Sequence, residues 1–171
     1  SAFADPQGAG TFAAMKWRIA EVRPGSQVVS PDEDIVLIPD GAEWKYFKGT
    51  QEPSPRDRTG WREFNFDDRF WPQGATPIGW GEPASFLATT LTGMQYQYSS
   101  FYVRKKFTVD DLSRIDTLRL EAMYDDGFNV WINNTFVLQQ NMPSENVPYD
   151  GYANGAQSSE KSWFTFTLPE P

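Results

Sequence analysis

Apolar and polar residues alternate along several short stretches of the chain, and each stretch predicts a β-strand. In the segment 100–109, SFYVRKKFTV, Phe101, Val103 and Phe107 share one face, while Arg104 and Lys106 lie on the other. An antiparallel strand with one side against a core shows this period of two. Comparable patterns predict further strands over 15–21, 35–39, 42–48, 117–124, 128–132, 135–140 and 162–168.

Turn and breaker residues separate these stretches and favour loops over helices. Asn133 and Asn134 lie between two predicted strands, and asparagine tolerates the positive φ of a two-residue hairpin turn. Residues 61–83 are rich in aromatic side chains but are interrupted repeatedly by Pro and Gly, so we expect an irregular connection anchored by its aromatic rings. The segment 109–116 predicts the one helical turn. Many short strands with almost no helix indicate an antiparallel β-sandwich.

The composition excludes several kinds of chemistry. At 171 residues the chain has the length of one domain, and it contains neither cysteine nor histidine. Disulfides, thiolate zinc sites and nucleophiles paired with histidine are therefore excluded. A formal charge of −8 argues against a nucleic-acid partner, and no apolar run is long enough to predict a membrane span.

Four segments, in this order and spacing, resemble one family: 37–47 (LIPDGAEWKYF), 61–81 with FDDRFWPQG and PIGWG, 101–111 (FYVRKKFTVDD) and 123–143 (MYDDGFNVWINNTFVLQQNMP). They are similar to the galactose-binding-like jelly-roll domain, a noncatalytic module of bacterial secreted and cell-surface multidomain proteins. The resemblance spans about residues 35–168. It implies a β-sandwich module over 35–171, and it leaves 1–34 as a lead-in or the tail of a preceding domain. It also implies an extracellular or cell-surface location and covalently attached catalytic or surface domains as partners.

The chain departs from the family pattern at two kinds of position. The family usually has Asn-Gly where this chain has Asn133 and Asn134, which the tolerance of asparagine for positive φ accommodates. It often has tyrosine where this chain has Trp80 and Trp131, and these changes enlarge two aromatic surfaces at places suited to a ligand. We expect Trp131 to pack between layers rather than to be exposed.

Asp125 and Asp126, next to Gly127, allow three interpretations. As a glycosidase pair they would have to face each other across a sugar, which adjacent residues at a strand entrance do not do. They could instead bind a metal. The interpretation we favour is that Asp126 stabilises a turn through side-chain to backbone hydrogen bonds.

The resemblance also raises the prospect of one structural calcium ion, because such modules often carry one near the ends of the sandwich. Calcium takes six to eight oxygen ligands. Asp40, Glu43 and Glu160 are the candidate metal ligands, since their segments should meet where the first and last strands pair. For each of these acids, simple solvation is the alternative.

Aromatic residues make up 16% of the chain, and those on predicted loops are candidates for ligand binding. Sugars stack their C–H faces on exposed rings and bond their hydroxyls to polar side chains. Arg104 and Lys106 could contribute charge toward an anionic polysaccharide, although an ion pair of Arg104 with Glu121 is an equally good interpretation. The candidate ligand-binding residues are Trp80, Tyr96, Tyr98, Arg104, Tyr149 and Tyr152.

These patterns support three hypotheses about function. The first is a noncatalytic carbohydrate-binding module that holds an attached enzyme near a neutral or anionic polysaccharide. The second is a structural or protein-interaction domain whose aromatic residues serve packing. An enzyme is the least favoured, because histidine is absent and the paired carboxylates are poorly placed. Convergence of Trp80 with the loop tyrosines on one exposed patch would favour the first.

Overall fold

The structure is a computed structural model that describes residues 1–3, 11–22, 35–112, 115–159 and 161–168. Within these ranges the fold is nearly all β, and the short 3₁₀ helix η1 (Gly60–Arg62) interrupts a long connection. No helix in the described part of the chain is long and apolar enough to cross a membrane. The strands are β1 (Ala2–Phe3), β2 (Thr11–Val22), β3 (Ile35–Ile38), β4 (Glu43–Lys48), β5 (Gln73–Ala75), β6 (Ile78–Trp80), β7 (Thr89–Thr90), β8 (Ser100–Arg104), β9 (Ile115–Asp125), β10 (Gly127–Ile132), β11 (Thr135–Gln140) and β12 (Phe164–Leu168).

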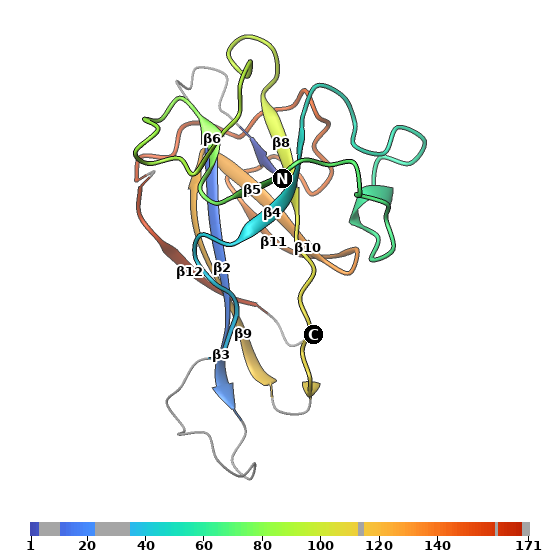
Figure 1. Cartoon of the computed structure of the whole chain (residues 1–171), viewed down its shortest axis with the longest axis vertical. Helices are drawn as coiled ribbons and strands as arrows, with labels where there is room; N and C mark the ends of the chain where they lie inside the picture. The colour runs from blue at the N-terminus through green and yellow to red at the C-terminus, as the bar shows by residue number, and fades with distance from the viewer. Residues whose placement is uncertain (4–10, 23–34, 113–114, 160, 169–171) are drawn as a thin grey trace.

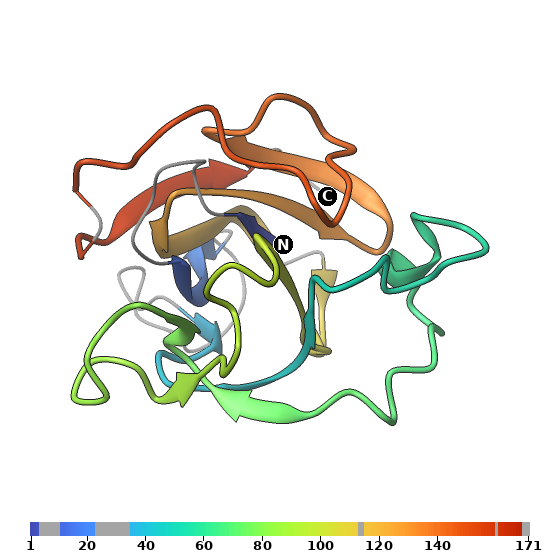
Figure 2. The same ribbon diagram turned by 90° about the horizontal axis from the view of Figure 1, so that it is seen from above.

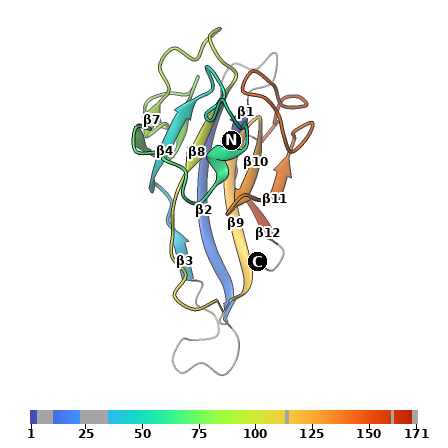
Figure 3. The same cartoon turned by 90° about the vertical axis from the view of Figure 1, so that its right-hand side faces the viewer.

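These strands form two sheets (Figures 1 and 3). Sheet A has the order β11-β10-β1-β8-β4-β5, and sheet B has the order β12-β9-β2-β6-β7, with β3 paired to β2. The described pairings are antiparallel, except that β6 and β7 run parallel. The all-β, mainly antiparallel architecture predicted from the alternating pattern is therefore confirmed.

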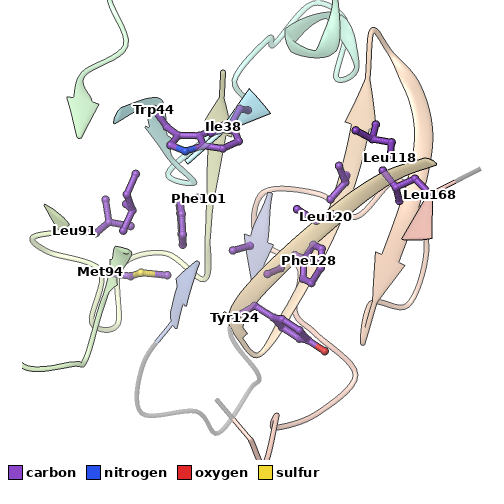
Figure 4. Packing of buried hydrophobic residues seen from close by; sticks show 14 residues of the cluster. Ile38, Trp44, Leu91, Met94, Phe101, Leu118, Leu120, Tyr124, Phe128 and Leu168 are labelled. Atoms are coloured by element: carbon purple, nitrogen blue, oxygen red, sulfur yellow. The ribbon is translucent and has the colours of Figure 1, made fainter. Parts of the chain in front are cut away.

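Side chains from both sheets meet in one central core (Figure 4). Phe101 and Phe128 from sheet A and Leu120 from sheet B are completely buried. The ring of Tyr124 meets that of Phe128 edge-on, with 4.6 Å between centroids. Burying a side chain of this size stabilises the fold by roughly 1.5–3 kcal/mol. The apolar face predicted for the strand at 100–109 is the face that covers this core.

The hairpin between β10 and β11 also forms as predicted. Asn133 and Asn134 adopt φ values of 47° and 68°, which are the left-handed values that a tight two-residue turn requires. Across the ladder Phe128 pairs with Gln140 and Ile132 with Thr135, with one register shift after Val130. The turn thus sets the register that presents Phe128 to the core.

Asp125, Asp126 and Gly127 form the direct link from β9 in sheet B to β10 in sheet A. Both carboxylate residues are buried, and the peptide bond between them is cis. The Asp126 carboxylate accepts a hydrogen bond of 2.9 Å from the Gln157 backbone N–H. A Cβ on Gly127 would lie 2.7 Å from the sulfur of Met142, so the link requires glycine here. The expected side-chain to backbone hydrogen bond of Asp126 is present, but it reaches the backbone of Gln157 in a distant loop, so the capping of the local turn stays a prediction.

A second cluster of aromatic rings covers the opposite face of sheet A, outside the central core. Successive residues of a strand point to opposite faces, so Tyr102 lies on this outer face where Phe101 lies on the inner one. The connection 50–72 packs over it, and Trp61 meets Tyr102 and Trp131 edge-on at 5.1 Å and 5.5 Å. We call this group the aromatic cluster; it comprises Trp61, Trp71, Tyr102, Phe47, Phe66, Trp131 and Tyr149.

Several predictions require correction. Residues 2–3 and 11–22 belong to strands, so the strand predicted over 15–21 begins earlier, at Thr11, and a further strand precedes it, while residues 4–10 lie outside the described ranges. The connection 61–83 contains β5 and β6, because each pairs with a neighbouring strand that the local sequence does not reveal. The helical turn expected at 109–116 lies partly outside the described residues. The division of the chain at residue 34 stays a prediction.

Trp131 is half-buried, as expected for packing, but it does not lie between the two sheets. Its ring lies between sheet A and the covering connection, and the guanidinium of Arg62 lies 3.8 Å from its centroid. The strand pattern alone did not predict this outer layer, which the connection 50–72 forms over sheet A.

Candidate functional site

Two tyrosine-bearing loops lie against each other at the upper end of the molecule (Figure 1). One loop (residues 91–99) leads into β8, and the other (residues 149–153) follows β11 at a distance. Ser99 Oγ donates a hydrogen bond of 2.8 Å to the Gly151 carbonyl, and Ser100 Oγ donates one of 2.5 Å to the Tyr149 carbonyl. These two bonds join segments that are about fifty residues apart in the sequence. Figure 2 shows the ribbon of these segments from above. We refer to the two segments as the tyrosine loops.

The four tyrosines of these loops differ in exposure. Tyr96 is 97% exposed and Tyr152 is 46% exposed. Tyr96 has a φ of 60°, an unusual value for a side-chain-bearing residue, which places it at the tip of a tight turn. Tyr98 and Tyr149 are half-buried. The loops therefore present two aromatic rings to solvent and use the other two for packing.

Tyr98 and Tyr149 pack in different places. Tyr98 lies against the central core, its hydroxyl donates to the Thr92 carbonyl at 3.4 Å, and burial raises its pKa to about 12. Tyr149 belongs to the aromatic cluster, and its backbone N–H donates to the carboxylate of Glu52 at 3.3 Å. Both residues therefore fix the loops to the body of the domain.

Trp80, at the end of β6, lies beside the base of the first tyrosine loop. The Leu91 N–H donates a bond of 2.7 Å to the carbonyl of Gly79, the residue before Trp80. The Trp80 ring is half-buried against the central core. It is thus near the tyrosine loops, but part of its surface serves packing.

Arg104 lies on the outer face of sheet A and is bound to the connection that covers that face. Its Nε donates to the Asp68 carboxylate at 2.9 Å, and its other nitrogens donate to the carbonyls of Trp61 and Glu63. Its carboxylate partner is thus Asp68, whereas Glu121, the partner weighed from the sequence, lies on β9 of the other sheet. The side chain is 11% exposed, so its principal role here is to hold the aromatic cluster closed.

The candidate calcium ligands are only partly described. Asp40 accepts a bond of 2.9 Å from the Gly41 N–H within the turn after β3, and Glu43 accepts one of 2.8 Å from the Gln73 side chain. Glu160 lies outside the described residues. No group of three or more acidic residues able to hold a metal occurs in the described part of the chain. Two carboxylates alone fall short of a calcium shell, so the ion stays a prediction.

A cavity lies elsewhere, between β8 and β10 of sheet A. It has a volume of about 570 Å³. Its walls include Trp44, Trp61, Arg62 and Trp131. Sequence reasoning did not identify this site, because its walls come from both faces of sheet A and from the covering connection. The pairing of Trp61 with Arg62 in an aromatic segment was the available signal.

Comparison with protein-family models, with curated proteins and with solved structures found no match to this chain. Two features of the molecule bear on its function. These are the tyrosine loops with their exposed rings and the cavity in sheet A.

Proposed function

We propose that this chain is a noncatalytic carbohydrate-binding module, built as a galactose-binding-like jelly-roll β-sandwich, with the tyrosine loops as its binding surface. The observation that carries the proposal is that two hydrogen-bonded loops present Tyr96 and Tyr152 to solvent at one end of the domain. Solvent-exposed rings on anchored loops are suited to stack against the C–H face of a sugar.

Polar side chains on the same loops can bond to sugar hydroxyls. Gln95, Gln97 and Asp150 are exposed, and so is Asn154, the residue after the second loop. Amides both donate and accept hydrogen bonds, which suits the mixed donor and acceptor pattern of a sugar. The surface is open and buries little ligand area, so weak affinity is expected.

The charges near these loops favour a neutral polysaccharide over an anionic one. Arg104 is bound to Asp68 on the outer face of sheet A. Lys48, at the base of the first loop, donates to the Thr92 carbonyl at 2.7 Å. Asp150 adds a negative charge to the second loop. An anionic glycan would therefore meet few unengaged cations here.

In this proposal the module acts by proximity and performs no chemistry. It would hold a covalently attached catalytic or surface domain near a polysaccharide outside the cell or at its surface, which raises the local substrate concentration. Asp125 and Asp126 take no part in catalysis, because both are buried in the link between the sheets. One calcium ion bound by Asp40, Glu43 and Glu160 belongs to the same proposal.

Affinity electrophoresis in gels containing neutral and anionic polysaccharides tests this function. We expect one neutral glycan to retard the chain, and we expect Tyr96→Ala to abolish the retardation. Phe70→Ala is the matched control, because Phe70 is 85% exposed but lies on the connection over sheet A. Unchanged mobility of the folded protein across a broad panel would refute the proposal. A parallel gel with chelator tests the calcium ion.

A second candidate function is protein interaction, and the cavity in sheet A favours it. Its walls combine the rings of Trp61 and Trp131 with the cations of Arg62 and Lys106, which suit contact with an acidic and apolar polypeptide surface.

A further inference from the structure

The chain contains one Asn-Gly pair, Asn154 followed by Gly155, directly after the second tyrosine loop. Asparagine is among the heat-labile residues of proteins. In this pair the main-chain nitrogen of the second residue can attack the side-chain amide of the first, and the two close a five-membered ring. Glycine has no Cβ to crowd its nitrogen, and its backbone reaches the conformations that the attack requires. The sequence of the pair therefore favours an intramolecular reaction.

Neither reacting group of the pair is held by a partner within the described residues. The side chain of Asn154 is exposed and its amide makes no hydrogen bond there, so it can rotate toward the next residue. The Gly155 N–H likewise has no hydrogen-bond partner in the described part of the chain. A Cβ placed on Gly155 would meet no atom within 4 Å, so no neighbouring group blocks the approach.

The other asparagines are less suited to this reaction. Each of them is followed by a residue that carries a side chain, which restricts the backbone of the attacking residue. The amide nitrogens of Asn129, Asn134 and Asn141 also donate hydrogen bonds of 2.6 to 3.1 Å to other residues, which hold these side chains in place. Asn154 thus combines a free amide with a glycine neighbour.

Three Asp-Gly pairs, beginning at Asp40, Asp126 and Asp150, could close the same ring but are poorer substrates. An ionised carboxylate repels an attacking nitrogen, and it offers no leaving group as good as ammonia. Asp126 is also buried. The Gly151 N–H after Asp150 donates to the Pro148 carbonyl at 2.9 Å, so that nitrogen is engaged.

We propose that Asn154 is a site of spontaneous deamidation. The Gly155 nitrogen loses its proton to hydroxide and attacks Cγ of Asn154. A bond forms between these two atoms, the bond from Cγ to Nδ2 breaks, and the amide nitrogen takes a proton from water and leaves as ammonia. Water then opens the cyclic imide at one of its two carbonyls. One opening gives aspartate in a normal backbone, and the other gives isoaspartate, whose backbone runs through the former side chain.

Isoaspartate would disturb two hydrogen bonds that hold this segment. The Asn154 N–H donates to the Asn141 carbonyl at 2.9 Å, and the Asn141 side-chain amide donates to the Gly155 carbonyl at 2.6 Å. The modification inserts one carbon into the main chain between these two anchored atoms, which lengthens it by about 1.5 Å. The two bonds cannot both keep their lengths. Because Ala153 packs against Met142 just before this point, the end of the second tyrosine loop should loosen.

Both products also replace an amide by a carboxylate, which accepts hydrogen bonds but donates none. The modified segment therefore gains a negative charge close in sequence to Asp150. The reaction requires only water and no ligand, so this proposal does not rest on carbohydrate binding and can succeed or fail without it.

Peptide mapping by mass spectrometry, after storage of the whole folded chain at mildly alkaline pH, tests the site. We expect Asn154 to give aspartate and isoaspartate at least about tenfold faster than any other asparagine reacts. The rate should rise with pH, because the attacking nitrogen must lose its proton. Faster reaction of another asparagine overturns the proposal.

The same chain unfolded in urea gives the rate of the pair without the fold. Since the structure holds neither reacting group, we expect the folded chain to react within about tenfold of the unfolded rate. A folded chain that reacts far more slowly overturns the proposal, because the fold would then protect the pair.

Asn154→Gln is the matched control for the structural consequence. Glutamine keeps the exposed amide but would have to close a six-membered ring, which forms far more slowly. We expect storage to speed amide hydrogen exchange over residues 151–154 several-fold in the unmodified sequence and to leave exchange in Asn154→Gln unchanged. Equal acceleration in the two chains contradicts the assignment.

Freshly prepared Asn154→Asp separates the added charge from the lengthened backbone. This variant carries the carboxylate on a normal main chain, so we expect its exchange over residues 151–154 to match that of the fresh unmodified chain. Acceleration as large as that of the stored chain would show that charge, and not isoaspartate, loosens the loop. Unchanged exchange in a stored chain that contains isoaspartate would equally overturn the structural consequence.

Discussion

The aromatic cluster and the tyrosine loops are both rich in rings, yet the structure treats them in opposite ways. In the cluster, Trp61, Trp71 and Tyr102 are 5%, 7% and 3% exposed beneath the connection 50–72. In the loops, Tyr96 and Tyr152 remain open to solvent. The ion pair of Arg104 with Asp68 fixes the connection 50–72 over the aromatic cluster, whereas no described segment covers the tips of the tyrosine loops.

This difference shows that aromatic content alone does not identify a binding surface. An aromatic ring contributes to stability when a connection of the chain covers it, and it remains free to contact a ligand when its own loop is the outermost layer. Substitution of a covered ring should therefore lower the free energy of unfolding strongly, and substitution of an exposed ring should lower it little. The following predictions test that division.

The largest effect is expected for Trp61→Ala. Trp61 is almost fully buried and contacts both Tyr102 and Trp131 edge-on. Removing a large buried ring leaves a cavity and typically costs about 3–5 kcal/mol. Urea unfolding should show this loss. Phe64→Ala is the control, since Phe64 is 66% exposed and its change should stay within about 0.5 kcal/mol. Similar losses of unfolding free energy in the two variants would contradict the division into covered, stabilising rings and exposed rings.

A smaller loss is expected for Arg104→Met. The variant keeps much of the side-chain length but leaves the Asp68 carboxylate and two carbonyls without their donor. Losing charge-assisted hydrogen bonds of this kind costs about 1.5–3 kcal/mol. Unfolding measurements should show the loss, while retardation by a neutral glycan should persist. Loss of retardation in folded protein would restore Arg104 as a ligand-binding residue.

A pH effect is expected at the high end of the scale. Burial raises the pKa of Tyr98 to about 12 and also raises that of Tyr102, so the folded state disfavours their ionisation. An unfolded tyrosine ionises near its ordinary pKa of about 10. The stability that these groups contribute is therefore complete below about pH 10 and declines as the pH rises toward 12. Unfolding free energies measured across this range should fall less steeply in Tyr98→Phe; an identical slope would contradict the assignment.

The smallest stability effect is expected for Tyr96→Ala. The side chain is 97% exposed, so unfolding free energy should change by no more than about 0.5 kcal/mol. Glycan retardation, in contrast, should be lost. A destabilised variant would show that Tyr96 serves packing like the rings of the aromatic cluster.

The sequence predicted the strands well because alternation is a local property. The inner face of β8 and the hairpin at Asn133 and Asn134 both follow from neighbouring residues, whereas the bond of Asp126 to Gln157 does not. The pattern also placed Trp131 on the face opposite Val130.

What the sequence did not predict depends on long-range contacts. The covering of the outer face of sheet A requires bonds such as Arg104 to Asp68 and Asn134 to Glu63, between residues 36 and 71 positions apart. The alternation of apolar and polar residues along the chain does not predict such contacts. The cavity in sheet A was likewise missed, because its walls come from strands and a connection that are far apart in the sequence. Among the candidate ligands, the pairing of the two tyrosine loops could not be read from spacing, since it rests on two serine hydroxyls.

The most direct test of the central claim is to map glycan binding on the isotope-labelled chain by backbone amide chemical shifts. Titration with the polysaccharide that retards the protein should shift amides of residues 93–99 and 150–153 and leave those of Trp61, Trp131 and Val103 unchanged. Shifts centred on Trp61, Trp131 and Val103 would contradict the account, because they would place the ligand in the cavity of sheet A instead of on the tyrosine loops.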